Sequence, residues 1–255
     1  MLKSSGYENS IISSSISTGF EQYKDIDVSL GLSASYDDLR TLSSASSSLK
    51  KQSGEFTEIS GNYGFAFDKR NRKFMPTDGS VITFRQAFPI FADKAFIDNT
   101  FLASNYVALS EDVITATKLY LSAVNGIDED VRISKRKGIS STRLRGFEKG
   151  KVGPIDGNDH IGGNYAAALN LEANLPNFLP EDSKTDVSVF LDFGNVWGVD
   201  YDSSISESNK IRSSAGIYAS WNSPIGPMTF VFSNALQKAS TDKTESFNFN
   251  LGTTF

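Results

Sequence analysis

The sequence predicts an all-β protein, an antiparallel β-barrel of the kind that crosses a membrane with its strands. Three observations lead to this prediction: apolar and polar residues alternate in many segments, these segments share one length, and the connections between them alternate in length. The chain has 255 residues, close to the roughly 200 to 250 that all-β barrels commonly occupy as one domain.

The alternation is clearest at the end of the chain, in residues 245–255. Phe247, Phe249, Leu251 and Phe255 are apolar, whereas the residues between them are polar or small. Successive side chains of a strand point to opposite faces, so one face of this strand can meet lipid and the other water. The same parity in residues 164–175 and 185–197 places Glu172 and Asp192 on the polar face.

We expect eleven strands of about ten residues, the length that a tilted strand needs to cross a bilayer. In chain order they are centred near residues 8–20, 26–37, 54–68, 79–89, 96–108, 113–125, 161–175, 185–197, 211–222, 227–237 and 245–255. No sustained period of 3.6 residues supports a helical domain.

The connections predict the topology. Short ones lie at residues 21–25, 109–112 and 223–226, and long ones at residues 38–53, 126–160 and 198–210. Short turns on one side and long loops on the other are typical of bacterial outer-membrane barrels. A soluble β-sandwich also has short strands and turns, but it does not predict this one-sided alternation.

The strand count indicates part of a larger barrel. Eleven strands with two free edges leave unpaired backbone groups in lipid, which costs free energy. The first fifteen residues also lack the basic and apolar regions of a secretory signal. We therefore expect further strands upstream of the chain.

Composition excludes several classes of function. A net charge of -5 and a pI near 5.0 argue against nucleic acid as a partner. The basic run Ser134-Lys135-Arg136-Lys137 is the exception, and we expect it to be a solvated loop face, with contact to lipopolysaccharide or a partner as the alternative.

Nothing in the sequence predicts an enzyme. The chain has no cysteine and a single histidine, His160, so a zinc site built from these ligands is not expected, and no nucleophile-elbow motif is present. Glu172 and Asp192 could serve as an acid and base pair, but a role as charge partners is the better interpretation. We expect no catalytic residue, no cofactor and no metal.

One motif lies in the middle of the longest loop: Arg143-Leu144-Arg145-Gly146-Phe147. It resembles the signature in the sixth extracellular loop of the BamA surface-antigen family. Further blocks follow that family's order: residues 74–79, Gly162-Gly163-Asn164, residues 192–197, Ser213 with Ala215-Gly216, and residues 221–227. The resemblance covers residues 74–255, and residues 1–73 carry only the strand pattern.

The resemblance implies a structure for this loop. In the family the loop folds back into the barrel lumen, so Arg145 is expected to pair with Glu172 and Asp192 as a lumenal clamp that includes Gly146 and Phe147. A planar guanidinium can engage two carboxylates, and glycine permits close backbone approach. For an isolated arginine, a solvated loop position would be the simpler interpretation. The family barrel has about sixteen strands, so the chain is expected to be its N-terminally truncated C-terminal part, without the periplasmic POTRA repeats.

The resemblance also implies a function, that of a non-enzymatic factor in the bacterial outer membrane that folds and inserts other β-barrels. Implied partners are outer-membrane lipid, lipopolysaccharide, unfolded outer-membrane proteins and assembly-complex lipoproteins. Phe247, Phe249, Leu251 and Phe255 match a C-terminal assembly signal, although terminal aromatics also anchor at membrane interfaces. The alternatives are a translocation-assembly or two-partner secretion pore of the same superfamily, and a porin-like passive channel.

Overall fold

The computed structural model describes most of the chain. The described residues are 2–3, 6–73, 75–175, 179, 183, 185–205, 207, 210–223 and 226–252. Phe74 of the first family block, Pro224 and Ile225 of the last block, and Phe255 of the expected C-terminal signal lie outside them.

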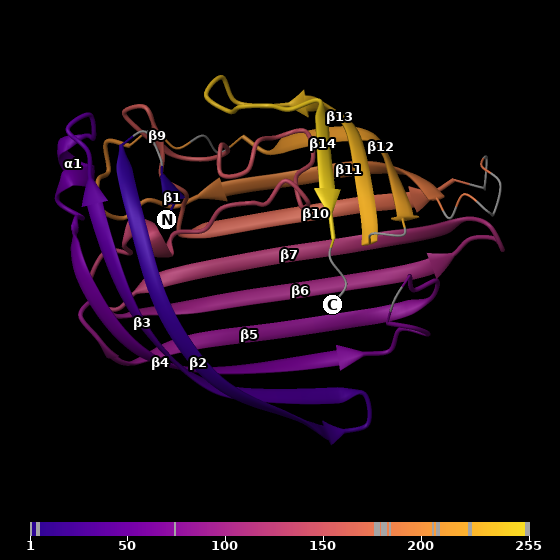
Figure 1. Ribbon diagram of the computed structural model, residues 1–255, viewed down its shortest axis with the longest axis horizontal. Helices are drawn as coiled ribbons and strands as arrows, with labels where there is room; N and C mark the ends of the chain where they lie inside the picture. The colour runs from indigo at the N-terminus through magenta and orange to yellow at the C-terminus, as the bar shows by residue number, and fades with distance from the viewer. Residues whose placement is uncertain are drawn as a thin grey trace.

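One antiparallel sheet dominates the fold, and its strands neighbour one another in chain order (Figure 1). The strands are β1 (Leu2–Lys3), β2 (Tyr7–Tyr23), β3 (Ile26–Thr41), β4 (Gly54–Asp68), β5 (Gly79–Ala92), β6 (Phe96–Ala108), β7 (Ile114–Gly126), β10 (Tyr165–Asn174), β11 (Thr185–Trp197), β12 (Arg212–Ser223), β13 (Gly226–Gln237) and β14 (Phe247–Leu251). Apart from the two-residue β1, these correspond to the eleven predicted strands. The predicted fold class is therefore confirmed.

The alternation of the sequence becomes two different faces of the sheet. In β10, Leu171 is exposed on the outer face, whereas Ala168 and Asn170 are buried on the inner one. The outer face carries exposed apolar side chains along the whole sheet, among them Ile16, Leu32, Phe65, Ile82, Ile217, Phe232 and Phe249. Such a belt suits lipid and would be costly in water.

Two strand ends differ from the prediction for a common reason. Strand β10 begins at Tyr165, later than expected, because Gly163 pairs with Lys137 of the preceding loop. Strand β14 begins at Phe247 because Thr244 pairs with Phe147 of the same loop. In both places the loop replaces the neighbouring strand as the hydrogen-bonding partner.

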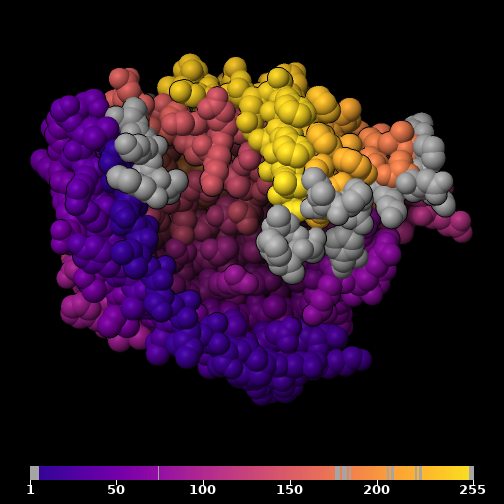
Figure 2. Space-filling view, viewed as in Figure 1, coloured from indigo at the N-terminus to yellow at the C-terminus, as the bar shows by residue number. Residues whose placement is uncertain are grey.

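The sheet curls, but within the described residues it does not close. Strand β1 lies at one edge, followed by β2, and β14 lies at the other edge. Figure 2 shows a hollowed face between the indigo β2 and the yellow β14, with more central segments of the chain at its back.

The core lies between the inner wall of the sheet and the connection from β7 to β10, residues 127–164, which we call the long loop. Leu144 and Phe147 of this loop pack with Ala166 and Val196 of the wall in one buried cluster. The long loop holds a 3₁₀ turn (Ile133–Lys135) and the short strands β8 (Ile155–Asp156) and β9 (Asp159–His160).

A second buried cluster joins three connections at one end of the barrel. It combines Ile133 and Ile161 of the long loop with Leu39 of β3 and Leu49 of helix α1 (Ser47–Lys50), and Tyr201 packs against it. The described residues include no helix long and apolar enough to cross a membrane.

Candidate functional site: the folded-back arginine loop

The signature segment of the long loop lies against the inner wall. Gly146 has φ +88°, a conformation that L side chains rarely adopt. A Cβ atom there would lie 3.2 Å from Ser214 Cβ, so glycine also permits the close approach to β12. The side chains of Leu144 and Phe147, on either side of this turn, are both buried.

Arg145 meets both carboxylates that the sequence places on the inner face. Its Nε and Nη2 donate to Asp192 Oδ2 and Oδ1 at 2.7 and 2.6 Å, and its backbone N–H donates to Oδ2 at 3.0 Å. Its Nη2 also lies 3.0 Å from Glu172 Oε1. The two-pronged geometry uses the planar fork that only arginine offers. We call Arg145, Asp192 and Glu172 the Arg145 anchor.

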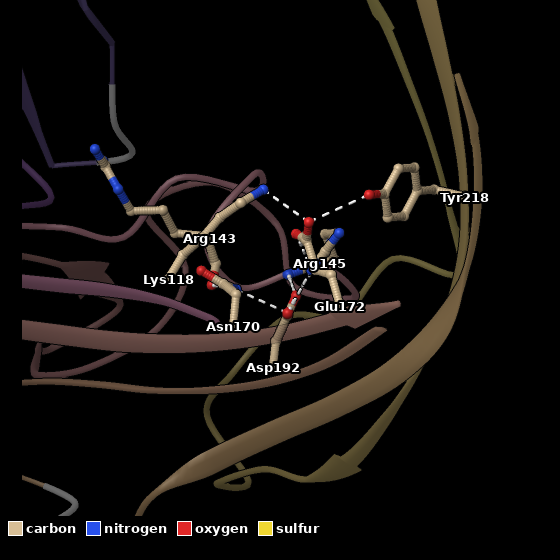
Figure 3. Close-up of polar contacts among 7 residues, drawn as sticks. All are labelled: Lys118, Arg143, Arg145, Asn170, Glu172, Asp192 and Tyr218. Carbon is tan, nitrogen blue, oxygen red and sulfur yellow. Dashed lines mark hydrogen bonds and ion pairs between the residues drawn. The ribbon is translucent and has the colours of Figure 1, made fainter. Parts of the chain in front are cut away.

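Three further side chains complete the bonding of these carboxylates (Figure 3). Lys118 Nζ of β7 lies 2.7 Å from Glu172 Oε2, to which the Tyr218 hydroxyl of β12 donates at 3.2 Å. Asn170 Nδ2 donates to Asp192 Oδ1 at 2.7 Å and to the carbonyl of Arg143 at 2.8 Å. The contacts come from four neighbouring strands, so the loop segment is tied to a broad part of the wall.

Aromatic rings support the two arginines of the motif. The Arg145 guanidinium carbon lies 3.8 Å from the Phe190 ring centroid, and that of Arg143 lies 4.0 Å from the Tyr120 centroid. Burial lowers the pKa of Arg145, but the hydrogen bonds and charge of Asp192 raise it by more, so its pKa lies above the ordinary value. Arg145 is therefore a permanent cation in this site.

The basic run corrects the sequence interpretation. The expectation of a solvated loop face for residues 134–137 is wrong, because the exposed fraction of the Arg136 side chain is 0% and that of Lys137 is 13%. Arg136 pairs with Asp200 of the β11–β12 connection, and Lys137 pairs with Asp98 of β6. Acidic side chains of the wall and of the β11–β12 connection therefore compensate the charge of the run.

A second buried arginine, Arg132, precedes this run. Its Nη1 lies 3.5 Å from Asp37 Oδ2 of β3, and its Nη2 lies 3.5 Å from Glu58 Oε2 of β4. Lys135 Nζ lies 2.8 Å from the same oxygen of Glu58, and the Ser134 hydroxyl donates to Asp37 Oδ2 at 2.5 Å. We call Arg132, Asp37 and Glu58 the Arg132 anchor.

The Arg132 anchor is bonded less completely than the Arg145 anchor. Among the described residues, Arg132 Nε and Nη1 have no hydrogen-bond partner. The guanidinium instead stacks on Phe56, with its carbon 4.5 Å from the ring centroid. Burial lowers the pKa of Arg132 below its ordinary value, although Asp37 and Glu58 act in the opposite direction.

The described part of the expected C-terminal signal faces outward. Phe247, Phe249 and Leu251 are each about half exposed on the outer face of β14. Phe247 and Phe249 stand opposite Phe232 and Phe230 of β13, with ring centroids 5.1 Å apart in both pairs. These aromatic pairs join the last strand to its neighbour on the lipid side.

The geometry leaves Glu172 and Asp192 no free role as an acid and base pair, because Arg145 engages both. His160 is buried in β9. Within the part of the chain that the structure describes, no group of three or more histidine or acidic residues is placed to hold a metal ion.

Sequence reasoning missed Arg132 with its partners, and Lys118 with Tyr218. The available signal was parity, since Asp37, Glu58 and Lys118 all lie within predicted strands. A charged residue within a membrane strand is expected to face the lumen, where it needs a partner of opposite charge.

The fold and this site define a class: a transmembrane β-barrel whose long loop is folded inward and fixed by an arginine to acidic wall residues. A family model of the Omp85 superfamily domain matches residues 3–255. The chain therefore belongs to the Omp85 superfamily, and it is an outer-membrane β-barrel protein.

Individual relatives point in the same direction. The chain is 25% identical over 260 residues to the outer membrane protein assembly factor BamA of Neorickettsia risticii, covering 98% of this chain and 34% of that protein. It is 33% identical over 139 residues to BamA of Neisseria meningitidis, covering 44% of this chain and 17% of that protein. The chain thus spans about a third or less of the length of these relatives.

Solved structures agree on the fold. The crystal structure of BamA from Haemophilus ducreyi lacking POTRA domains 1-3 superposes with a TM-score of 0.85 at 24% identity, over 98% of this chain and 55% of that one. CdiB from Acinetobacter baumannii superposes with a TM-score of 0.60 at 12% identity, over 96% of this chain and 42% of that one.

Proposed function

We propose that this chain is the barrel portion of an outer-membrane protein assembly factor, a non-enzymatic protein that helps other β-barrels fold and insert. The observation that carries the proposal is the Arg145 anchor, which fixes an R-G-F loop inside the barrel. The similarity to BamA of Neorickettsia risticii extends over 98% of this chain.

The interior of the barrel favours this function over a passive channel. Apolar side chains of the long loop, including Leu144 and Phe147, pack on the inner wall, and Ile133 and Ile161 close a further cluster at one end. A porin instead keeps a polar, water-filled lumen. A lumen filled by a packed loop leaves less room for solutes to pass than the water-filled lumen of a porin.

The edge strand of the sheet offers main-chain hydrogen-bonding groups that assembly can use. Strand β14 pairs with β13 on one side, and no strand of the described residues pairs with its other edge. An unpaired strand edge can receive an incoming strand through main-chain hydrogen bonds, which requires neither a nucleotide nor a covalent step. Unfolded outer-membrane proteins are the proposed substrates.

Two classes of partner follow from the surface and the resemblance. The outward apolar belt is matched to outer-membrane lipid, and assembly-complex lipoproteins are proposed from the family resemblance alone. The basic run gives no support to a lipopolysaccharide contact, because its basic side chains are paired with acidic side chains of the chain itself.

The test is reconstitution of the full-length protein in lipid vesicles. An unfolded outer-membrane protein is added, and its folded fraction is followed by heat modifiability on gels. We expect a higher folding rate than with empty vesicles or with vesicles that carry a porin of equal mass. An unchanged rate contradicts the proposal.

Conductance separates the remaining alternatives. A passive channel predicts a large, steady, selective single-channel conductance from the same vesicles. A translocation pore predicts transfer of a soluble cargo across the membrane without any gain in barrel folding. The assembly factor predicts the folding gain with low and unsteady conductance.

A further inference from the structure

Strand β14, with five residues, is much shorter than its neighbour β13. Strand β13 has 12 residues, but its register with β14 covers only Met228 to Phe232. Beyond that stretch, two further bonds join the segments: the Ser233 amide donates to the carbonyl of Ser246, and the Gly252 amide donates to the carbonyl of Pro227. About a third of β13, residues 234–237, therefore extends past the pairing with β14.

The chain before β14 pairs with the long loop instead. Glu148 N–H donates to the carbonyl of Lys243 at 3.0 Å, and Glu245 N–H donates to the carbonyl of Gly146 at 3.1 Å. These two bonds flank the antiparallel bridge between Phe147 and Thr244. A third bond, from Lys243 N–H to the carbonyl of Lys151 at 3.2 Å, closes the pairing. The loop thus acts as a short strand for residues 243–245.

A buried ion pair fixes the same segment from the other side. Arg212 of β12 donates from Nε and Nη2 to Asp242 Oδ2 and Oδ1, both at 2.9 Å, and both side chains are 0% exposed. Asp242 Oδ2 also accepts from the backbone N–H of Ala239 at 2.6 Å. The residue before the paired segment is therefore locked to the wall.

These contacts follow one another along the chain. Gly146, whose carbonyl accepts from Glu245, is the residue next to Arg145 of the anchor. The anchor fixes the loop, the loop fixes residues 243–245, and these lead directly into β14. Besides the pairing with β13, this path is a second set of contacts that leads to β14.

We propose that residues 146–151 of the long loop, together with Arg212 and Asp242, are positioning residues for β14. Through them the Arg145 anchor sets the order and register of β14, including its edge on the side away from β13. That an incoming strand uses this edge rests on the proposed function, but the positioning itself does not.

The experiment is hydrogen exchange with mass spectrometry on the full-length protein in lipid vesicles. Glu245→Pro removes the amide that donates to Gly146. Thr244→Pro is the matched control, because at a bridge of this type the Thr244 amide points away from the loop. Both prolines sit in extended chain. Glu245→Pro also removes the carboxylate that accepts from Asn248 Nδ2 at 2.9 Å, so Glu245→Ala, which keeps the amide, is the control for that loss.

In Glu245→Pro we expect amides of residues 247–251 to exchange about tenfold faster, the size of effect that follows from one lost main-chain hydrogen bond. Amides of β5 and β6, which lie far from β14 in the sheet order, keep their rates, as do those of β14 in Thr244→Pro and Glu245→Ala. Asp242→Asn, which removes the charge but keeps the shape, is the second variant and gives the same regional pattern.

Two results overturn the proposal. Faster exchange in residues 146–151 with unchanged β14 means that loop and strand are independent. An equal increase in β5, β6 and β14 means that the contacts only stabilise the barrel as a whole. Neither readout depends on assembly activity, so failure of the proposed function is recognised separately in the vesicle folding assay.

Discussion

The two arginine anchors of the long loop differ in how completely they are bonded. At the Arg145 anchor, the guanidinium donates to Asp192 at 2.6 and 2.7 Å and lies 3.0 Å from Glu172. At the Arg132 anchor, both carboxylates are 3.5 Å away, and an aromatic ring covers the cation. The Arg145 anchor therefore depends on directed hydrogen bonds, and the Arg132 anchor depends on charge attraction and stacking on an aromatic ring.

The pKa directions express the same difference. The pKa of Arg145 is raised because Asp192 outweighs burial, whereas the pKa of Arg132 is lowered because burial outweighs its acidic neighbours. A buried ion pair contributes to stability only when hydrogen bonds offset the loss of water. The Arg145 anchor meets that condition more fully, so it should contribute more to holding the loop.

The largest expected effect comes from Arg145→Ala. The variant leaves Asp192 buried without its cation, which costs about 3–5 kcal/mol of unfolding free energy. Arg132→Ala should cost less, about 1–3 kcal/mol, because Lys135 still pairs with Glu58 and Ser134 with Asp37. Urea unfolding of the full-length protein in vesicles measures both.

A control for this pair is Arg40→Ala. The Arg40 side chain is 73% exposed and pairs with Asp38 at the surface, so its loss should leave the unfolding midpoint unchanged. If Arg132→Ala costs as much as Arg145→Ala, completeness of bonding does not set the strength of the anchors.

Lysine substitution tests geometry directly and has the next largest effect. Lysine keeps the charge but loses the planar fork, so Arg145→Lys gives up the paired bonds to Asp192 and costs about 1.5–3 kcal/mol. Arg132→Lys keeps a cation near Asp37, Glu58 and Phe56, and should cost under about 1 kcal/mol.

The readout is loop accessibility as well as stability. Limited proteolysis of residues 127–164 should be faster in Arg145→Lys and unchanged in Arg132→Lys, relative to the parent protein. Equal proteolysis of the two variants would show that the fork geometry of Arg145 has no special role.

The sequence predicts the wall of this barrel better than its interior. Strand positions follow from a period of two residues, a local pattern that survives in a single sequence, and parity alone places Glu172 and Asp192 on the face that Arg145 reaches. The pairing itself required the family resemblance, because residues 145 and 192 are brought together only by the fold.

The predictions for the interior were wrong where a local sequence pattern was used and the actual partner lies far away in the sequence. A run such as residues 134–137 is normally solvated, and nothing within it indicates that Asp98, Glu58 and Asp200 lie opposite. The start of β14 shifted for a similar reason, since its pattern extends to residue 245 but the loop takes over the hydrogen bonds of residues 243–245. In both cases a long loop that folds inward replaced water or a strand as the partner.

The smallest expected effect concerns pH and the part of the loop that follows both anchors. His160, the only histidine of the chain, is buried in β9. Burial lowers its pKa below the usual 6.5, and Lys151 and Lys243 lower it further, while Asp242 and Asp159 act in the opposite direction. The unfolded loop therefore binds a proton more readily than the folded one.

The sign follows from that difference. Above about pH 6.5 His160 is neutral in both states and the loop has its full stability; as pH falls below 6.5, the unfolded state gains a proton first and the loop is destabilised. Both anchor arginines stay charged over this range. Proteolysis of the long loop should rise modestly from pH 7.5 to 5.5 in the parent protein and not in His160→Gln. If the two proteins respond alike, the acid sensitivity does not come from His160 but from the carboxylates of the anchors. The difference in bonding between the two anchors should then appear as a difference in how strongly low pH destabilises each of them.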